Sequence, residues 1–544
     1  MLPTASLVDR ATAPPQTIAC ADWYAAVDTQ TELAGVRDAG AARVAGFPHL
    51  RVDRFTASLK DALPPQPANS PAVAALVQRL QQLDIDARLA EIANLPPQAL
   101  AQLTGSTAVP PTTAQVLQKM QDCAQQLSAY HLASTEQTAI LLGRLAVPDD
   151  YRSSYRLLGA YALTRYPFAS GIRRFEAERS AVFAWASAPP ASGATSNGST
   201  APTSAKSLRL SPPAQLPSSA LSAAQISRML APAPQDLLRV PAPTPEQAQQ
   251  LLAHFAPRFN LAIDSDDDKP GALVWRPGLG TGAPDRLEVD TQTPVVYSQV
   301  AFTRYGTHSL LQLVYTLWFP ARPVERGKTL DLLAGKLDGV TWRVTLAPDG
   351  TPLVYDTMHP CGCYHMFFPT PAALATPAPQ PGIEWAFIPQ TLPHITAQQR
   401  LVVHVAAGTH YIDHVSVEPV GSGSTASSDP APPSAPHFVP GKSAPIAAQY
   451  GWRSYDSLRS LPTPLVEGAA AASKPTYRSI FGPDGFIANT DRPERFIFWP
   501  MGIPRAGAMR QWGKHATAFV GRRHFDDATL MEQRFEFDSK HFAP

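Results

Sequence analysis

The chain of 544 residues has few cysteines, little net charge and no long apolar run. Four cysteines are too few for a scaffold built from disulfides at this length. No apolar run reaches the roughly 18 residues that a transmembrane helix needs, so we expect no transmembrane segment. The formal net charge of +1 provides no broad basic field, so we expect no nucleic-acid partner.

Proline, in contrast, is abundant. The 57 prolines are about twice the average usage of ~5%. Hydrophobic residues make up 44% of the chain, which is enough for a folded core. At about 150 residues per domain, the length predicts three or four domains. The composition excludes a long coiled coil, a collagen and a wholly disordered chain.

The segment 21–187 has the pattern of a helical domain. Ser70 can cap a helix that begins with Pro71, because serine is favoured at the N-cap and proline at the first helical position. Another helix has one apolar face, formed by Val116, Met120, Cys123, Leu127 and Tyr130. This face predicts that Cys123 is a small core residue and not a reactive thiol. Two further helices are predicted at 151–166 and 169–184.

Changes in composition divide the rest of the chain. Residues 188–223 and 421–447 are rich in Ser, Pro and Ala and cannot bury enough apolar surface to fold, so we predict flexible linkers. Between them, 224–420 predicts short helices followed by an antiparallel sheet domain. Residues 448–544 form an irregular C-terminal extension that is expected to pack on another domain. The sequence therefore predicts an α+β protein with a helical N-terminal region.

Alternating hydrophobicity identifies strands in the central domain. Val340, Trp342 and Val344 alternate with polar residues, which is the pattern of a half-buried strand. The run 310–319 is apolar on both faces and predicts a central strand. Further strands are predicted at 384–388, 401–406 and 410–417, and a short one at 495–499.

Two histidines and two cysteines fall within seven residues, directly after a predicted strand. These residues are His359, Cys361, Cys363 and His365. Imidazole and thiolate are the ligands that metals such as zinc prefer. An extended backbone would turn all four side chains to one face, and bends at Pro360 and Gly362 could also bring them together. The spacing differs from the usual zinc pattern of two separate ligand pairs. The segment nevertheless predicts a metal site, with zinc as the candidate cofactor.

Two other interpretations of the same segment stay open. Gly362 permits a turn that could bring Cys361 and Cys363 to disulfide distance, and the flanking histidines could lower the thiol pKa. Alternatively, both cysteines are small buried residues at a strand end and the histidines are hydrogen-bonded. The residues alone do not decide among a metal site, a disulfide or redox pair, and a structural role.

Three more histidines could contribute to such a site: His404, His410 and His414. A two-residue turn at Ala407-Gly408 would place His404 and His410 diagonally across a hairpin. His410 and His414 would share a strand face. Single hydrogen-bonded histidines are the commoner case, so their role as ligands is a hypothesis.

Two charged segments have simpler interpretations. Residues 264–268 resemble the start of a calcium loop, but Lys269 stands where such a loop needs glycine, so we predict a solvated acidic turn. Residues 521–527 combine arginines, one histidine and two aspartates. Because no nucleophile is marked nearby, we predict a surface ion-pair network there.

The tetrad that ends in Cys20 is similar to the end of a lipoprotein signal, in which the cysteine becomes the lipidated first residue. The apolar segment that should precede it is interrupted by Pro3, Asp9 and Arg10. A lipid anchor at Cys20 is therefore a hypothesis, and a chance cysteine is its alternative. We expect the cell envelope or periplasm if a signal lies upstream, and the cytoplasm otherwise.

Three segments resemble uncharacterised proteins of Gram-negative bacteria, some of which look like lipoproteins. The segments are 147–151, with the sequence VPDDY, 355–365, and 498–503, with the sequence FWPMGI. The resemblance would cover most of the chain. It implies an envelope location and carries over no activity and no catalytic residues.

The leading functional hypothesis is an envelope-associated binding or structural protein with a metal or disulfide site in the 359–365 loop and an envelope protein as partner. The alternative is a metal-dependent hydrolase that uses the same loop as its source of ligands. Whether the chain is an enzyme is left open. An enzyme requires a pocket beside the loop with an uncommitted carboxylate or histidine, whereas a binding module would keep the loop closed and dry.

Overall fold

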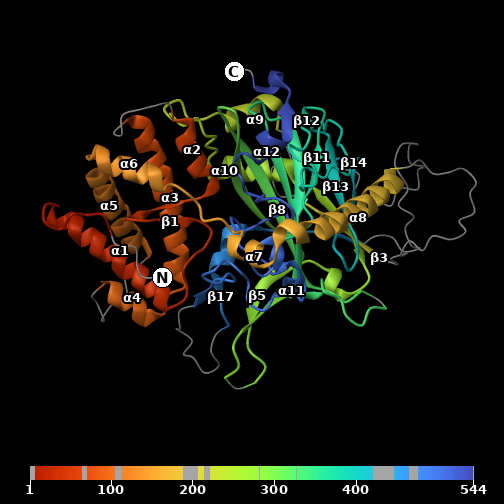
Figure 1. The fold of residues 1–544 in the computed structure, drawn as a ribbon, viewed down its shortest axis with the longest axis horizontal. Helices are drawn as coiled ribbons and strands as arrows, with labels where there is room; N and C mark the ends of the chain where they lie inside the picture. Colours follow the sequence, from red (N-terminus) through yellow and green to blue (C-terminus); the bar gives the residue numbers. More distant parts are fainter. Residues whose placement is uncertain are drawn as a thin grey trace, which may run out of the picture.

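The computed structural model describes residues 6–63, 70–104, 113–187, 206–213, 221–280, 282–325, 327–420, 446–464 and 476–542. Helices gather in the N-terminal part, strands follow in antiparallel and mixed sheets, and the C-terminal part is largely irregular (Figure 1). The predicted α+β class is confirmed. Within these ranges no helix combines the length and apolarity that crossing a membrane requires.

The N-terminal part packs its helices around a short hairpin. Ser70 accepts a hydrogen bond from the Val73 amide, and Pro71 is the first helical residue, so the predicted cap is confirmed. The elements are α1 Pro15–Leu33, β1 Ala42–Val44, β2 Phe47–Val52, α2 Arg54–Ala62, α3 Pro71–Ala93, α4 Pro97–Thr104, α5 Thr113–Leu132 and α6 Thr135–Arg144.

A disulfide between Cys20 and Cys123 joins α1 to α5. Cys123 lies on the buried apolar face of α5, as its spacing predicts, but it is cross-linked and not a free core thiol. Cys20 is buried inside α1. Its sulfur is bonded to Cys123 here, and one sulfur cannot also carry a lipid thioether. The lipid-anchor hypothesis therefore has no support from this geometry.

Two helices cross to the sheet region: α7, Ser153–Leu158, and α8, Tyr161–Ser187. The sequence predicts two helices of similar length here, whereas the structure has a short one and a long one. The break falls at Gly159 and at Ala160, whose φ of 47° is left-handed, and Pro167 is accommodated inside α8. In Figure 1, α8 runs in front of the sheet strands.

The larger sheet has six strands in the order β11-β10-β9-β8-β7-β16. The run 310–319 lies in β8, which is buried on both faces between β7 and β9, so the predicted central strand is confirmed. The strands are β7 Val295–Tyr305, β8 His308–Arg322, β9 Gly335–Leu346, β10 Pro352–Met358, β11 Met366–Pro369 and β16 Gly451–Ser454.

The second sheet has five strands in the order β14-β13-β4-β3-β15. The main core lies between the two sheets and includes Phe259 and Val403 from the second sheet and Tyr315 and Val344 from the first. β13 pairs with β4 in parallel, so this sheet is mixed. The strands are β3 Lys206–Ser211, β4 Arg258–Ile263, β13 Gln399–Val405, β14 Ile412–Pro419 and β15 Ile446–Gln449.

The predicted linkers fall mostly on 188–205, 214–220 and 421–445, which lie outside the described residues. β3 lies within the segment predicted as the first linker. It forms a strand because its leucines alternate: Leu210 is fully buried, and the backbone pairs with β4 and β15.

Two predicted strands are wrong. Residues 384–388 form no ladder of strand hydrogen bonds. The Phe387 carbonyl accepts a hydrogen bond from the Phe367 amide, and the Glu384 amide donates one to the Val520 carbonyl. The backbone is therefore hydrogen-bonded only at isolated residues. Residues 495–499 are helical, as α11 Arg495–Phe498 and a 3-10 turn Trp499–Met501. Proline at 500 has no amide hydrogen for a ladder, which favours the helical turn.

The C-terminal part fills the space between the helices and the larger sheet. Tyr151 from the helical side donates to the carbonyl of Ala518, and Arg54 pairs with Asp526. From the sheet side, Arg343 donates to the carbonyl of Phe525. The remaining elements are α9 Ala223–Leu230, α10 Pro245–Phe255, β5 Ala272–Arg276, β6 Arg286–Asp290, β12 Ala373–Ala375, α12 Leu530–Arg534, β19 Phe535–Phe537 and the short pair β17 Leu461–Pro462 and β18 Tyr477–Arg478.

Candidate functional site

A tight turn follows β10 and brings the two cysteines of the 359–365 loop together. The His359 amide donates to the Cys363 carbonyl at 3.0 Å, and the Gly362 amide donates to the His359 carbonyl at 2.8 Å. Gly362 has a φ of 89°, and a Cβ there would lie 2.5 Å from the Ala516 carbonyl oxygen, so only glycine fits. The thiols of Cys361 and Cys363 are free, buried and hydrogen-bonded to each other.

His359 contacts a buried carboxylate. Its Nδ1 lies 3.2 Å from Asp338 of β9, and the same carboxylate contacts His410 at 2.8 Å and Arg492 at 3.2 Å. Burial alone would raise the pKa of Asp338, but His359 and Arg492 outweigh it and hold this pKa well below its usual range. The carboxylate of Asp338 is therefore ionised and holds both His359 and His410 in place.

His365 bonds to a different carboxylate. Its Nε2 lies 2.9 Å from Asp356 of β10, and Arg343 on the neighbouring strand pairs with the same aspartate. Burial lowers the pKa of His365 to about 3, so the ring is neutral near pH 7. The loop thus directs its two histidines to two separate acidic partners.

The four predicted metal ligands therefore do not converge. The turn joins the cysteines to each other, while each histidine is committed to an aspartate. Across the described ranges no three His, Cys, Asp or Glu side chains are grouped so that they could hold a metal ion. The zinc site stays a prediction without support from this geometry.

The three distant histidines separate into two places. His404 and His414 are directly opposite on β13 and β14 and stack with ring centroids 3.7 Å apart, in the second sheet. His410 lies in the preceding turn with a φ of 54°, not on the strand face predicted for it. It stacks on Phe319 and bonds to Asp338, so only His410 is connected to the 359–365 loop.

Both charged segments are more buried than expected. Asp268 is not a solvated turn residue: it is 1% exposed and lies 3.4 Å from His410. His524 forms the predicted ion-pair network with Asp149, Asp150 and Asp527. Asp149 and Asp527 raise the pKa of His524 to about 9 despite its burial, so the ring is charged near pH 7.

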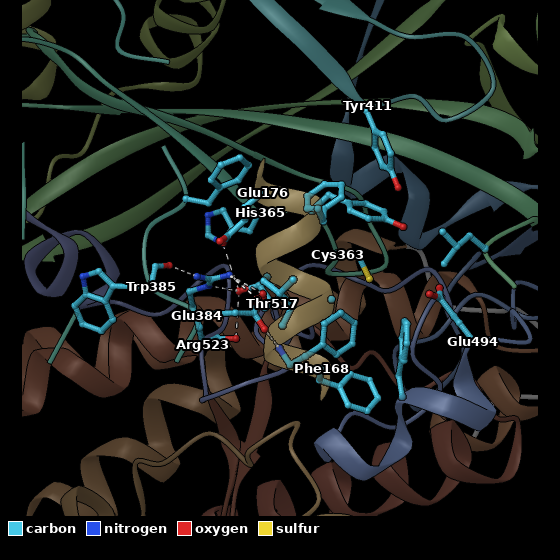
Figure 2. Close-up of a pocket in the computed structure, with 18 of the residues that line it drawn as sticks. Phe168, Glu176, Cys363, His365, Glu384, Trp385, Tyr411, Glu494, Thr517 and Arg523 are labelled. Atoms are coloured by element: carbon cyan, nitrogen blue, oxygen red, sulfur yellow. Dashed lines mark hydrogen bonds and ion pairs between the residues drawn. The ribbon is translucent and has the colours of Figure 1, made fainter. Parts of the chain in front are cut away.

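An aromatic cavity of about 460 Å³ opens beside the loop. α8 forms one wall, and the loop, the segment around Trp385 and the C-terminal part form the others (Figure 2). Cys363 and His365 line it, so the loop is not closed and dry. Its aromatic lining consists of Phe168, Phe175, Tyr364, Trp385, Phe387, Tyr411, Phe498 and Phe519.

Most polar groups of the cavity already have partners. Glu384 accepts from the amides of Phe519 and Val520. Arg523 donates to Thr517 and to the Trp385 carbonyl. These groups can shape the cavity wall but have little capacity left for a ligand.

Glu494 is the exception. It is 1% exposed, it lines the cavity, and its carboxylate has no hydrogen-bond partner within the described part of the chain. Burial raises its pKa to about 7, against the opposing effects of Arg492 and Arg322. In Figure 2 the Cys363 sulfur lies on the side of the cavity that Glu494 occupies. A cavity with an uncommitted carboxylate beside the loop meets the expectation for an enzyme, and the open loop differs from the closed, dry loop expected of a binding module. The same carboxylate also suits a site for a cationic ligand.

Two buried guanidinium groups interact with the thiol pair. Arg492 and Arg510 interact electrostatically with Cys361, and both are 1% exposed. Nε and Nη1 of Arg492 and Nε of Arg510 lack acceptors among the residues described. The hydrogen bond between the thiols lowers the pKa of Cys361, and Arg492 adds to this effect against the cost of burial.

Four residues at or beside the loop are not predicted from the sequence: Asp338, Asp356, Glu494 and Arg492. One signal could have found Asp356: the hairpin register pairs it with Arg343, and two opposite charges on a buried strand pair predict an ion pair. Glu494 gives no such signal, because only the tertiary fold brings it to the loop.

Comparisons with protein families, with curated proteins and with solved structures give no match for this chain.

Proposed function

We propose that the chain is a binding protein of the cell envelope whose aromatic cavity holds an apolar organic cation. The observation that carries the proposal is Glu494, a buried carboxylate without a partner in a cavity of aromatic side chains. Aromatic faces attract cations through their quadrupoles, and a carboxylate supplies the opposite charge. A cavity of this size suits a small ligand.

A second carboxylate of the cavity favours the same ligand charge. Glu176 of α8 also lines the cavity, and burial raises its pKa. The cationic side chain in the cavity, Arg523, is bonded to Thr517 and the Trp385 carbonyl, and it lies beside Glu384. A ligand that carries a positive charge would pair with the buried Glu494 and be attracted by Glu176, whereas an anion would be repelled by both.

The disulfide supports the proposed location. The Cys20–Cys123 bond joins two helices of the N-terminal part. Disulfides persist in oxidising compartments such as the periplasm and are rare in the cytosol.

We expect wild-type protein to bind benzyltrimethylammonium at least about tenfold more tightly than its neutral carbon isostere, neopentylbenzene, because only the cation can pair with Glu494. Glu494→Gln should remove most of this difference. Glu178→Gln is the matched control, because Glu178 lies on α8 outside the cavity. Isothermal titration calorimetry measures both affinities, and equal binding of the two probes to the wild type overturns the proposal.

The same affinity should depend on pH. The carboxylate must be ionised to pair with the cation, and the pKa of Glu494 in the empty cavity is raised to about 7. Binding should therefore be about tenfold weaker near pH 6 than near pH 8, because protonation competes with the ligand. The permanent charge of the probe excludes titration of the ligand itself. A flat pH profile would show that Glu494 does not contact the cation.

The thiol pair favours a second function, thiol–disulfide exchange. The unpaired guanidinium donors of Arg492 and Arg510 beside Cys361 would stabilise a thiolate. In the step, the two thiols become one disulfide and release two protons. The two electrons reduce an external organic disulfide to two thiols.

Glutathione disulfide should oxidise the Cys361–Cys363 pair. Intact-mass analysis should show the loss of two hydrogen atoms, and peptide mapping should place the new bond between these residues. Arg510→Gln should slow the reaction and move its pH profile to higher pH, because less thiolate forms. A mixed disulfide that persists on one cysteine, or no reaction, argues against the exchange function.

A further inference from the structure

The outer surface of α7, the start of α8 and α11 presents large apolar side chains to solvent. Leu157 is 82% exposed, Leu158 78%, Leu163 72% and Phe496 68%. Tyr166 is also exposed, one helical turn after Leu163. We call this the α7–α8 surface. Scattered apolar residues are normal on a protein, but several on adjacent elements indicate an interaction site.

These elements form one packed unit. The ring of Tyr155 in α7 contacts Trp499, with centroids 6.0 Å apart, directly after α11. Arg156 donates to the Met501 carbonyl at 2.8 Å. Phe168 of α8 contacts Phe498 of α11 at 5.4 Å. The exposed apolar side chains are therefore held on a rigid base and do not belong to a loose segment.

The surface is also strongly basic. Residues 151–187 contain six arginines and two glutamates, a net charge of +4, although the whole chain has only +1. Arg152, Arg173 and Arg174 are exposed and form no ion pair with any described residue. Much of the positive charge is thus free to meet a negative partner.

We propose that the α7–α8 surface binds an anionic lipid bilayer. The exposed leucines and aromatic rings would enter the boundary between headgroups and acyl chains, and the arginines would pair with lipid phosphates. A second copy of the chain fits this surface less well, because two faces that each carry unpaired arginines would repel one another. The sheet beneath α8 holds this helix along the protein surface. The helix would therefore lie in the membrane interface and would not span the bilayer.

This placement has a consequence for the cavity. Phe168 and Phe498 line the aromatic cavity and belong to the same helices, α8 and α11, as the exposed Leu163 and Phe496. A docked molecule would therefore hold the cavity close to the lipid headgroups. The docking itself does not depend on what the cavity binds, so either proposal can fail without the other.

Sedimentation with vesicles tests the proposal on the full chain. We expect binding to vesicles of phosphatidylglycerol and phosphatidylcholine in equal parts, and much weaker binding to phosphatidylcholine alone. The double variant Leu157→Glu, Leu158→Glu should weaken the partition coefficient by at least about tenfold, because two apolar anchors are lost and two negative charges are added. Raised salt should also weaken it.

Leu279 and Leu374 supply the matched control, since they are 79% and 71% exposed elsewhere on the molecule. Leu279→Glu, Leu374→Glu should bind as the wild type does. The substituted leucines of both variants are exposed, so an unchanged thermal unfolding curve is expected. Equal binding of the two double variants, or no preference for the anionic vesicles, overturns the proposal. A wild-type dimer in size-exclusion chromatography that only the Leu157 variant loses would assign the surface to self-association instead.

Discussion

Asp338→Ala is expected to lower the free energy of unfolding by about 3–5 kcal/mol, because it removes one partner from a buried charged cluster. Asp338 is fully buried, and its carboxylate contacts His359, His410 and Arg492. Without it, the Arg492 guanidinium stays buried and loses its ion pair. Guanidinium chloride unfolding measures the loss.

One further variant separates the effect of the charge from that of hydrogen bonding, and another serves as a control. Asp338→Asn keeps the shape and one acceptor oxygen but loses the charge, so its effect should be intermediate. Asp266→Ala is the control, because the Asp266 side chain is 89% exposed and pairs only with Lys269 on the surface. It should change stability by less than about 0.5 kcal/mol. A loss below about 1 kcal/mol for Asp338→Ala would show that water or a rearranged side chain replaces the carboxylate.

Local sequence patterns predicted the structure correctly where it depends on residues within a single helix or strand. The cap at Ser70 depends on neighbouring residues, and the two-faced apolar run of β8 depends on its own sequence. Both predictions were confirmed. The strand predicted at 495–499 failed because its aromatic residues suit a strand locally, whereas Pro500 and the packing of Phe498 against α8 favour a helical turn.

The candidate site could be predicted only in part, because it is built from contacts over long sequence distances. The sequence marked the 359–365 loop, and the structure places that loop at the cavity. The carboxylates that capture its histidines come from β9 and β10, and the uncommitted one, Glu494, comes from the C-terminal part. Four potential ligands that are close in sequence do not form a metal site when each imidazole is hydrogen-bonded to a carboxylate instead. The sequence alone does not show which carboxylates lie beside the histidines, because this depends on the tertiary fold.

The Cys20–Cys123 disulfide should contribute the other large effect. It closes a loop with a sequence separation of 103 residues. Cross-linking a loop of that length restricts the unfolded chain and is expected to stabilise the folded state by about 4–5 kcal/mol in the chain-entropy model. The double variant Cys20→Ala, Cys123→Ala should therefore unfold at clearly lower denaturant, with the loss confined to the N-terminal helices if these unfold separately from the sheets.

Reduction provides the matched comparison, because it breaks the same bond without a substitution. Dithiothreitol should destabilise the wild type by nearly as much as the double variant is destabilised, and it should leave the double variant itself unchanged. Non-reducing peptide mapping should recover the fragments containing Cys20 and Cys123 joined. If the wild type unfolds identically with and without reductant, the helices α1 and α5 are held by their apolar contacts alone. The disulfide would then no longer indicate an oxidising compartment, and the envelope location would lose its main support.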